Sequence, residues 1–319
     1  MMIRVALAIG LIAAATSAAP IGLYRVVHGW PVLATNQVLD EVSAVAVDSH
    51  DRVFVLTRGG RQWPVNGPVD TTAIAGPTVY VYDGRSGRLL STWPSSMFAL
   101  PHSITVDARD DVWVTDVAWH QVFKFNSEGK PLLTLGERGV PGEDAAHFNQ
   151  PSDVAVATGG AVYVSDGYGN NRVVKFDGAG RFLTAWGKKG AGQAEFNLPH
   201  ALALDTRGDV YVVDRENSRI QVFDSAGNYL TQWSAGFASP QDIKVSGNGQ
   251  VFVASAGHPG PLDSTGVVIF DAQRRVREKV GRVGHYDGQF WDLHWLALSK
   301  SGDLYTADFS GRRIQKFAR

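Results

Sequence analysis

The sequence predicts an all-β protein folded as a six-bladed β-propeller. Three observations support that prediction: internal repeats, alternation of apolar and polar residues with a period of two, and a composition rich in turn residues. The 319 residues include 35 glycines and nine tryptophans, which suit many short strands joined by tight turns. No segment shows a sustained helical stripe of apolar residues.

Six copies of one pattern follow one another along the chain. Each copy contains an apolar strand, a polar turn, a second strand of the form xVxVxD, a third strand and, in most copies, a fourth. The copies recur at intervals of roughly 40 to 60 residues, which is typical of four-stranded propeller blades rather than helical solenoids. The clearest copies begin at Leu100, Gln150 and Leu198, and weaker ones begin near Glu41, Ser239 and Trp291.

The sixth copy ends at Arg319, after its third strand. An open sheet edge invites pairing with another chain, so a fourth strand has to come from elsewhere. The segment 24–30 reads YRVVHGW and ends in a tryptophan, as the fourth strands at Trp186 and Trp233 do. We therefore expect the N-terminal segment to complete the last blade.

The first residues predict a secretory signal peptide. A short basic start (1–4) precedes an apolar run (5–15) and a stretch of small residues (16–19), and the run is too short for a dependable membrane span. The expected organisation is a signal over 1–19 and one propeller domain over 20–319, secreted or periplasmic. A retained N-terminal anchor is the alternative, and no other segment approaches membrane-spanning length.

Charge and cysteine content exclude several classes of function. The 30 Lys and Arg residues nearly balance the 31 Asp and Glu residues, so a general nucleic-acid binder, which needs a basic surface, is not expected. The absence of cysteine excludes disulfides, thiolate metal sites and cysteine nucleophiles. Any metal ion must be held by histidines, carboxylates or backbone oxygens.

One position at the start of each blade's first strand carries a distinctive pattern. First strands line a propeller's central channel, and alternate blades of six lie about 120° apart, so three histidines there can converge on one point. Such a set predicts a metal site with an open fourth position, for which zinc is favoured over other ions. The alternative is a set of hydrogen-bonded channel histidines. The six blades place Ser43, His102, Ser152, His200, Gln241 and His294 at this position.

Three loop residues depart from the repeat in a way that indicates a binding pocket. Arg58 and Arg215 occupy one position, just after the second strand of blades one and four, and Tyr168 lies one residue further along in blade three. Arginine side chains suit a carboxylate-bearing substrate. A tyrosine beside a divalent cation can serve as a base. The alternative for each residue alone is a surface or packing role.

The motifs LPHSITVD, QPSDVAV, VYVSDGYGNNR, LPHALAL and VDRENSRIQ resemble the NHL-repeat propeller of peptidyl-α-hydroxyglycine α-amidating lyase, the second catalytic domain of peptidylglycine α-amidating monooxygenase. The similarity extends from about Val42 to the C-terminus and is most specific from Leu100 to Phe223. It implies cleavage of a C-terminal α-hydroxyglycine into an amide and glyoxylate. The expected substrate is a small molecule or a peptide C-terminus, and the expected state is a monomer.

The resemblance also implies roles for individual residues. Zinc would be bound by the three histidines His102, His200 and His294. Tyr168 would remove the proton of the substrate hydroxyl, Arg58 would orient the substrate and stabilise developing charge, and Arg215 would line the same pocket.

A structural calcium ion is a further implication of the resemblance, with backbone oxygens of Val45 and Ile104 among its donors. Two departures bear on the metal sites. Trp295 stands where the family has the calcium carboxylate, directly after the third histidine, and Asp292 stands where the family has Met. Asp292 is therefore a candidate additional metal ligand. Loop cysteines of animal members are missing as well.

Two other functions fit the same sequence. One is a metal-dependent hydrolase or lactonase on the same propeller site, which rests on analogy of fold. The other is a non-catalytic NHL propeller that binds a protein or a glycan, with metal present only for stability.

Overall fold

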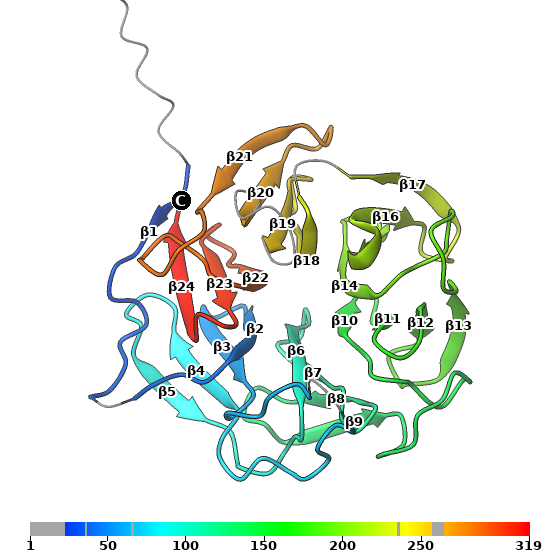
Figure 1. Cartoon of the computed structure of the whole chain (residues 1–319), viewed down its shortest axis with the longest axis horizontal. Helices are drawn as coiled ribbons and strands as arrows, with labels where there is room; N and C mark the ends of the chain where they lie inside the picture. Colours follow the sequence, from blue (N-terminus) through cyan, green and yellow to red (C-terminus); the bar gives the residue numbers. More distant parts are fainter. Residues whose placement is uncertain (1–22, 36, 65–66, 235–236, 257–264) are drawn as a thin grey trace, which may run out of the picture.

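The computed structural model describes residues 23–319 apart from 36, 65–66, 235–236 and 257–264. Six four-stranded antiparallel sheets surround a central channel, so the predicted six-bladed β-propeller is confirmed (Figure 1). The expected signal segment 1–19 lies outside the described residues. Within the part of the chain that the structure describes, no helical segment has the length and apolar character to cross a membrane.

The first three blades run in order along the chain, each from the channel outward. Blade one comprises β2 (Val42–Val47), β3 (Arg52–Thr57), β4 (Val79–Asp83) and β5 (Leu89–Thr92). Blade two comprises β6 (Pro101–Val106), β7 (Val112–Asp116), β8 (Gln121–Phe125) and β9 (Pro131–Leu135). Blade three comprises β10 (Asp153–Val156), β11 (Val162–Asp166), β12 (Arg172–Phe176) and β13 (Phe182–Trp186).

The remaining three blades continue the same order. Blade four comprises β14 (Pro199–Leu204), β15 (Val210–Asp214), β16 (Arg219–Phe223) and β17 (Tyr229–Trp233). Blade five comprises β18 (Ser239–Val245), β19 (Val251–Ala256), β20 (Gly266–Phe270) and β21 (Val276–Val280). Blade six comprises β22 (Leu293–Leu298), β23 (Leu304–Asp308), β24 (Arg313–Ala318) and the N-terminal β1 (Arg25–Val26).

The ring is closed by the N-terminal segment, as the sequence predicts. β1 pairs antiparallel with β24, and the backbone N–H of Val27 donates to the carbonyl of Lys316 at 2.8 Å. The strand is shorter than the expected segment 24–30, because only two residues pair as strand. Trp30 lies beyond the strand and packs its ring 4.9 Å from the ring of Tyr305, so it still anchors the closure.

The innermost strands carry an irregularity at the position that holds the histidines. In five of the six blades the pairing of the first and second strands shifts register there, which is a β-bulge. A bulge leaves its extra residue unpaired and re-aims the side chain. The residues skipped by the register are Ser43, His102, His200, Gln241 and His294, with Ser103 also skipped in blade two.

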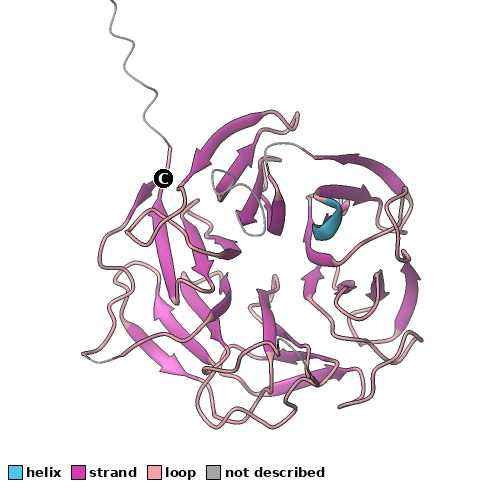
Figure 2. Ribbon diagram, in the orientation of Figure 1, coloured by secondary structure: helices cyan, strands magenta, loops and turns pink. Residues whose placement is uncertain are grey.

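Only one short helix occurs among the described residues, the 3₁₀ turn η1 (Arg215–Asn217) after β15 (Figure 2). The apolar core lies largely between neighbouring sheets: Trp113 and Val122 of blade two, for example, pack with Val154 and Val162 of blade three. Because strands alternate their side chains between two faces, each blade is buried on both sides. The channel end of each blade is therefore held rigidly.

Candidate active site

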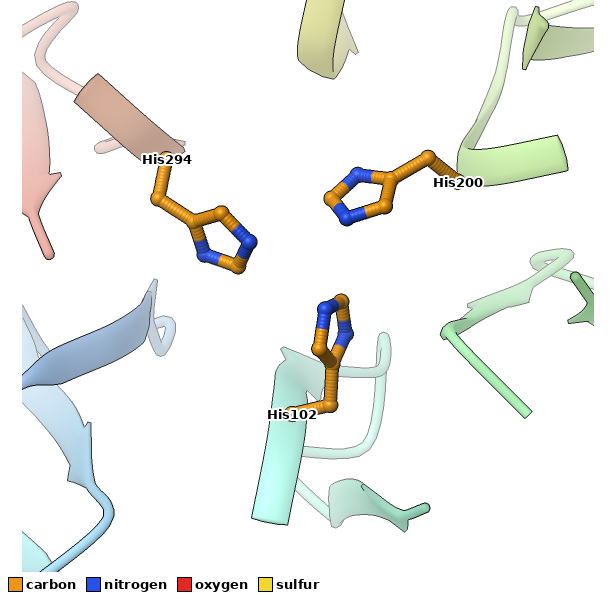
Figure 3. A group of neighbouring side chains, drawn as sticks. All are labelled: His102, His200 and His294. Carbon is orange, nitrogen blue, oxygen red and sulfur yellow. The ribbon is translucent and has the colours of Figure 1, made fainter. Parts of the chain in front are cut away.

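Three histidines project into the channel from β6, β14 and β22 (Figure 3). One ring nitrogen of each lies no more than 4.8 Å from those of the other two, and His102, His200 and His294 are all buried. At zinc–nitrogen bonds of about 2.0–2.1 Å, ligands of a tetrahedral ion stand about 3.4 Å apart, a separation inside that limit. The structure thus brings together the three residues of the predicted zinc site.

The other nitrogen of each ring contacts the backbone of the next blade. In every case Nδ1 lies within hydrogen-bonding distance of a carbonyl oxygen, which can only accept, so Nδ1 carries the proton and Nε2 keeps its lone pair. Hydrogen bonding of the remote nitrogen is also how metal-binding histidines are usually oriented. The pairs are His102 with Ser152 (2.6 Å), His200 with Gln241 (2.6 Å) and His294 with Ser43 (2.5 Å).

Burial keeps the three imidazoles neutral. It lowers the pKa of His294 to about 3, with the charge of Arg58 adding to the effect. The pKa values of His102 and His200 are also held well below the ordinary value, first by burial and then by neighbouring positive charge or histidine. Only the neutral ring offers a lone pair to a metal ion, so the electrostatics suit coordination.

The hydroxyl of Tyr168 lies between two of these histidines. Its oxygen is 2.9 Å from Nε2 of His102 and 2.9 Å from Nε2 of His200. A phenol has one proton and can satisfy only one of two acceptor nitrogens, so one lone pair stays without a donor. A bound cation would accept the lone pairs of all three ring nitrogens at once. The cluster of lone pairs without enough hydrogen-bond donors therefore fits a metal ion.

In four blades the second strand ends in a buried aspartate, and three of these aspartates fix the segments from which the histidines emerge. Asp116, Asp214 and Asp308 accept hydrogen bonds from backbone N–H groups just before His102, His200 and His294, respectively. Asp214 also pairs with Arg219, at 2.7 Å. In blade three, Asp166 likewise accepts from the backbone N–H of Asn149 and pairs with Arg172 at 2.9 Å, so anchoring explains the recurrence of this aspartate.

Arg58 is a buried cation that faces the pocket, and no carboxylate of the described residues forms a salt bridge with it. Its side chain is 4% exposed, and its one hydrogen bond runs from Nε to the carbonyl of Pro101 at 3.4 Å. The guanidinium lies 4.6 Å from the ring centre of Phe309 and 5.7 Å from that of Trp63. Burial lowers the pKa of Arg58 from its ordinary value. Such a group favours an anionic ligand.

These side chains line one pocket of about 280 Å³ over the histidine cluster. Arg215 lies on its wall, with its guanidinium 5.8 Å from the ring centre of Tyr168, and it pairs with Glu216 at 3.0 Å. The structure therefore places Arg58, Tyr168 and Arg215 around one space. The full lining is Arg58, Trp63, Tyr168, Arg215, Glu216, Ser239, Gln241, Asp292, His294 and Phe309.

Asp292 lines the pocket but stands apart from the metal ligands. The group of mutually close ligand atoms contains only the three histidines. The Asp292 carboxylate instead accepts a hydrogen bond from the Ser310 hydroxyl at 2.7 Å. The structure therefore places this candidate ligand on the wall of the pocket.

Two aromatic side chains of the pocket were not anticipated from the sequence. Trp63 lies in the long connection between β3 and β4, and its ring is 4.7 Å from that of Tyr168. Phe309 follows β23 and packs on Arg58 and His294. The signal for Trp63 was the length of the blade-one connection, which no clear copy of the repeat shares.

Comparison with known proteins defines the class first. The NHL repeat family matches residues 98–125, 148–176 and 196–223, which are the three clearest copies of the blade pattern. Solved structures with the same fold include a gluconolactonase from Xanthomonas campestris, with a TM-score of 0.66 and 14% identity over 92% of this chain and 89% of that one. Another is a streptogramin B lyase, with a TM-score of 0.57 and 12% identity over 89% of this chain and 95% of that one. The protein is thus an NHL-repeat propeller.

Similarity to full-length proteins is more specific. The chain is 34% identical over 303 residues to peptidyl-alpha-hydroxyglycine alpha-amidating lyase 2 of Drosophila melanogaster, covering 88% of this chain and 71% of the relative. It is 41% identical over 170 residues to peptidylglycine alpha-amidating monooxygenase of Rattus norvegicus, covering 48% of this chain and 17% of that protein. The chain belongs to the peptidyl-α-hydroxyglycine α-amidating lyase family.

Proposed function

We propose that this protein is a zinc-dependent lyase that cleaves a peptidyl-α-hydroxyglycine, or a related N-acyl-α-hydroxyglycine, into an amide and glyoxylate. The observation that carries the proposal is the arrangement around the channel: three neutral histidines, the Tyr168 hydroxyl 2.9 Å from two of them, and the unpaired Arg58 on the same pocket. The names of the relatives support the reaction class.

The chain's own groups account for the proton movements of this reaction. His102, His200 and His294 would hold zinc, which supplies Lewis-acid polarisation of a substrate oxygen. Tyr168 acts as the base that takes the proton of the substrate hydroxyl. The O–H electron pair then forms the carbonyl of glyoxylate while the carbon–nitrogen bond breaks. The proton passes from Tyr168 to the leaving amide nitrogen, so atoms and charge balance.

Substrate binding follows from the charges and apolar surfaces of the pocket. Arg58 has no acidic hydrogen-bond partner among the residues that the structure describes, so a substrate carboxylate would supply its counter-charge. Arg215 adds a second cation on the same wall. Trp63 and Phe309 shield the Arg58 guanidinium from water, which strengthens the ion pair by lowering the local dielectric constant.

Export and a monomeric state are part of the same proposal. The signal-like segment 1–19 supports secretion or delivery to a periplasm. The ring is closed by the chain's own β1, which supports a monomer as the functional unit.

The proposal is tested by incubating the purified protein with an N-acyl-α-hydroxyglycine such as α-hydroxyhippurate and measuring glyoxylate. We expect release that stops after treatment with a strong chelator and returns on addition of zinc. Elemental analysis should find about one zinc per chain. Absence of glyoxylate from zinc-loaded protein would overturn the lyase assignment.

Matched variants distinguish the lyase from a hydrolase on the same site. Arg58→Met should lower kcat/KM by about 10²–10³-fold, because it removes the counter-charge of the substrate carboxylate. Arg181→Met, in an exposed turn, is the control and should be neutral. If Asp292→Asn abolished activity on a lactone while Tyr168→Phe kept it, a metal-dependent hydrolase would be the better description.

A further inference from the structure

An indole ring packs against all three histidines in the channel. Trp295 follows His294 on β22 and is fully buried. Its ring centre lies 5.6 Å from that of His102, 5.8 Å from that of His200 and 5.3 Å from that of His294. The indole thus forms a floor that contacts every member of the histidine cluster. It supplies no oxygen to this part of the channel.

A lysine from blade five lies against that floor. The ammonium of Lys244 is 5.4 Å from the ring centre of Trp295, a cation–π distance. It also donates to both carboxylate oxygens of Asp242, at 2.7 Å each. Asp242 is fully buried and accepts a hydrogen bond from the backbone N–H of Leu296, in the next blade. The ammonium is therefore fixed in place.

A second buried carboxylate completes the cluster. Asp153 follows Ser152 in blade three as Asp242 follows Gln241 in blade five, and it is 1% exposed. One of its oxygens accepts the backbone N–H of Leu202, and the other has no hydrogen-bond partner. Burial raises the pKa of Asp153, the positive charge of Lys244 opposes the rise, and the negative charge of Asp242 adds to it. The ammonium thus pairs with Asp242, while Asp153 is a buried carboxyl group that favours its protonated form.

The same lysine reaches the place that the family resemblance assigns to calcium. Val45 and Ile104, the expected backbone donors, line a channel cavity of about 210 Å³ together with Lys244. Calcium takes six to eight oxygen ligands, with carboxylates prominent among them. Here the carboxylate expected after the third histidine is an indole, and an ammonium holds both oxygens of Asp242. The residues present do not fit a calcium ion.

We propose that the Lys244 ammonium takes the place of a divalent cation in the channel of this protein. It neutralises Asp242, and the Trp295 indole stands where a calcium carboxylate is expected, so the propeller needs no calcium. The metal requirement is then confined to the three histidines. A tethered cation cannot dissociate, and the channel stays neutralised whatever the concentration of free calcium outside the protein.

The zinc-loaded wild-type protein provides the first test, and it depends on no variant. Thermal unfolding is followed while calcium chloride is raised from zero to about 10 mM, with magnesium chloride at equal ionic strength as the control. We expect the same Tm in both salts and no heat of calcium binding by titration calorimetry. A saturable rise in Tm with calcium alone, or a bound calcium ion at unit stoichiometry, would overturn the proposal.

A gain-of-function variant provides the second test. Trp295→Asp combined with Lys244→Met restores a carboxylate after the third histidine and removes the competing ammonium. We expect calcium to raise the Tm of this double variant, on the order of 5 °C when free calcium is about 100-fold above Kd. Trp295→Asp alone retains the ammonium and should respond at least tenfold more weakly. Equal responses of the two variants would show that Lys244 does not exclude the ion.

Discussion

At the scale of single residues, the hydroxyl of Tyr168 is the group whose role can be isolated most cleanly. It contacts Nε2 of two histidines at 2.9 Å, so removing it leaves the three rings and their carbonyl partners in place. Tyr163 of the same blade provides a matched residue, because its hydroxyl donates to the Ser225 carbonyl at 3.2 Å, away from the pocket.

We expect Tyr168→Phe to lower kcat by about 10²–10⁴-fold, the usual range for loss of a general base, with zinc content and Tm nearly unchanged. Tyr163→Phe should retain activity. Both are measured by glyoxylate release under saturating substrate. Wild-type kcat in Tyr168→Phe would show that another group takes the proton.

The buried Asp153 leads to a pH-dependent prediction. Burial raises the pKa of Asp153 above its ordinary value, and the charge of Lys244 opposes the shift. The folded protein therefore keeps a proton that the unfolded chain releases above about pH 4. The associated stability is present below that pH and is lost as the pH rises through the folded-state pKa.

Asp153→Asn has no proton to lose, so its stability should decline less steeply than that of the wild type from about pH 4 upward. Urea unfolding at a series of pH values measures the difference. Asp177→Asn is the control: turn hydrogen bonds lower the pKa of Asp177, so that substitution should act only below about pH 4 and leave the slope above it unchanged. Parallel curves for wild type and Asp153→Asn would contradict the assignment.

At the scale of strands and loops, the aspartate that ends the second strand in four of the blades connects the fold to the site. Asp214 closes β15, accepts the backbone N–H of Asn197 at 2.7 Å and pairs with Arg219. Asn197 lies three residues before His200, so this carboxylate positions the start of β14. Removing it leaves a buried guanidinium unpaired.

We expect Asp214→Ala to lower the free energy of unfolding by about 3–5 kcal/mol, the cost of breaking a buried ion pair. It should also weaken zinc retention, because His200 loses its anchor. Urea unfolding and competition with a chromogenic chelator measure the two effects. Asp224→Ala, in an exposed turn, should leave zinc retention unchanged. Unaltered zinc affinity in Asp214→Ala would show that the contacts of Asp214 with Asn197 and Arg219 do not help to hold the metal ion.

Features that repeat from blade to blade could be predicted from the sequence. Aligning six first strands predicted that His102, His200 and His294 meet, because symmetry places equivalent residues around one axis. Trp63 lies in an insertion without counterparts, so no alignment could place it over Tyr168. Lys244 was missed for a related reason: it lies in blade five, where the repeat is weak, and its contact with Trp295 joins two different repeat positions.

At the scale of the whole molecule, the ring explains how an all-β protein without cysteine is held together. The three histidines come from alternate blades, and their Nδ1 atoms bind carbonyls of the blades between, so every blade takes part in the site. Closure of the ring has to be maintained for this geometry to persist. Its closing contact is the short pairing of β1 with β24.

Deletion of residues 1–28 removes β1 and leaves β24 as an open edge, so we expect a lower Tm and self-association. Deletion of 1–22 keeps β1 and is the matched control. Trp30→Ala should cost about 3–5 kcal/mol by emptying the contact with Tyr305, whereas Trp291→Ala, at an exposed position, should cost little. Light scattering and thermal unfolding measure these effects. If both truncated proteins stayed monomeric with equal Tm, β1 would be dispensable, and the packing of blade six against its neighbours would have to hold the ring alone.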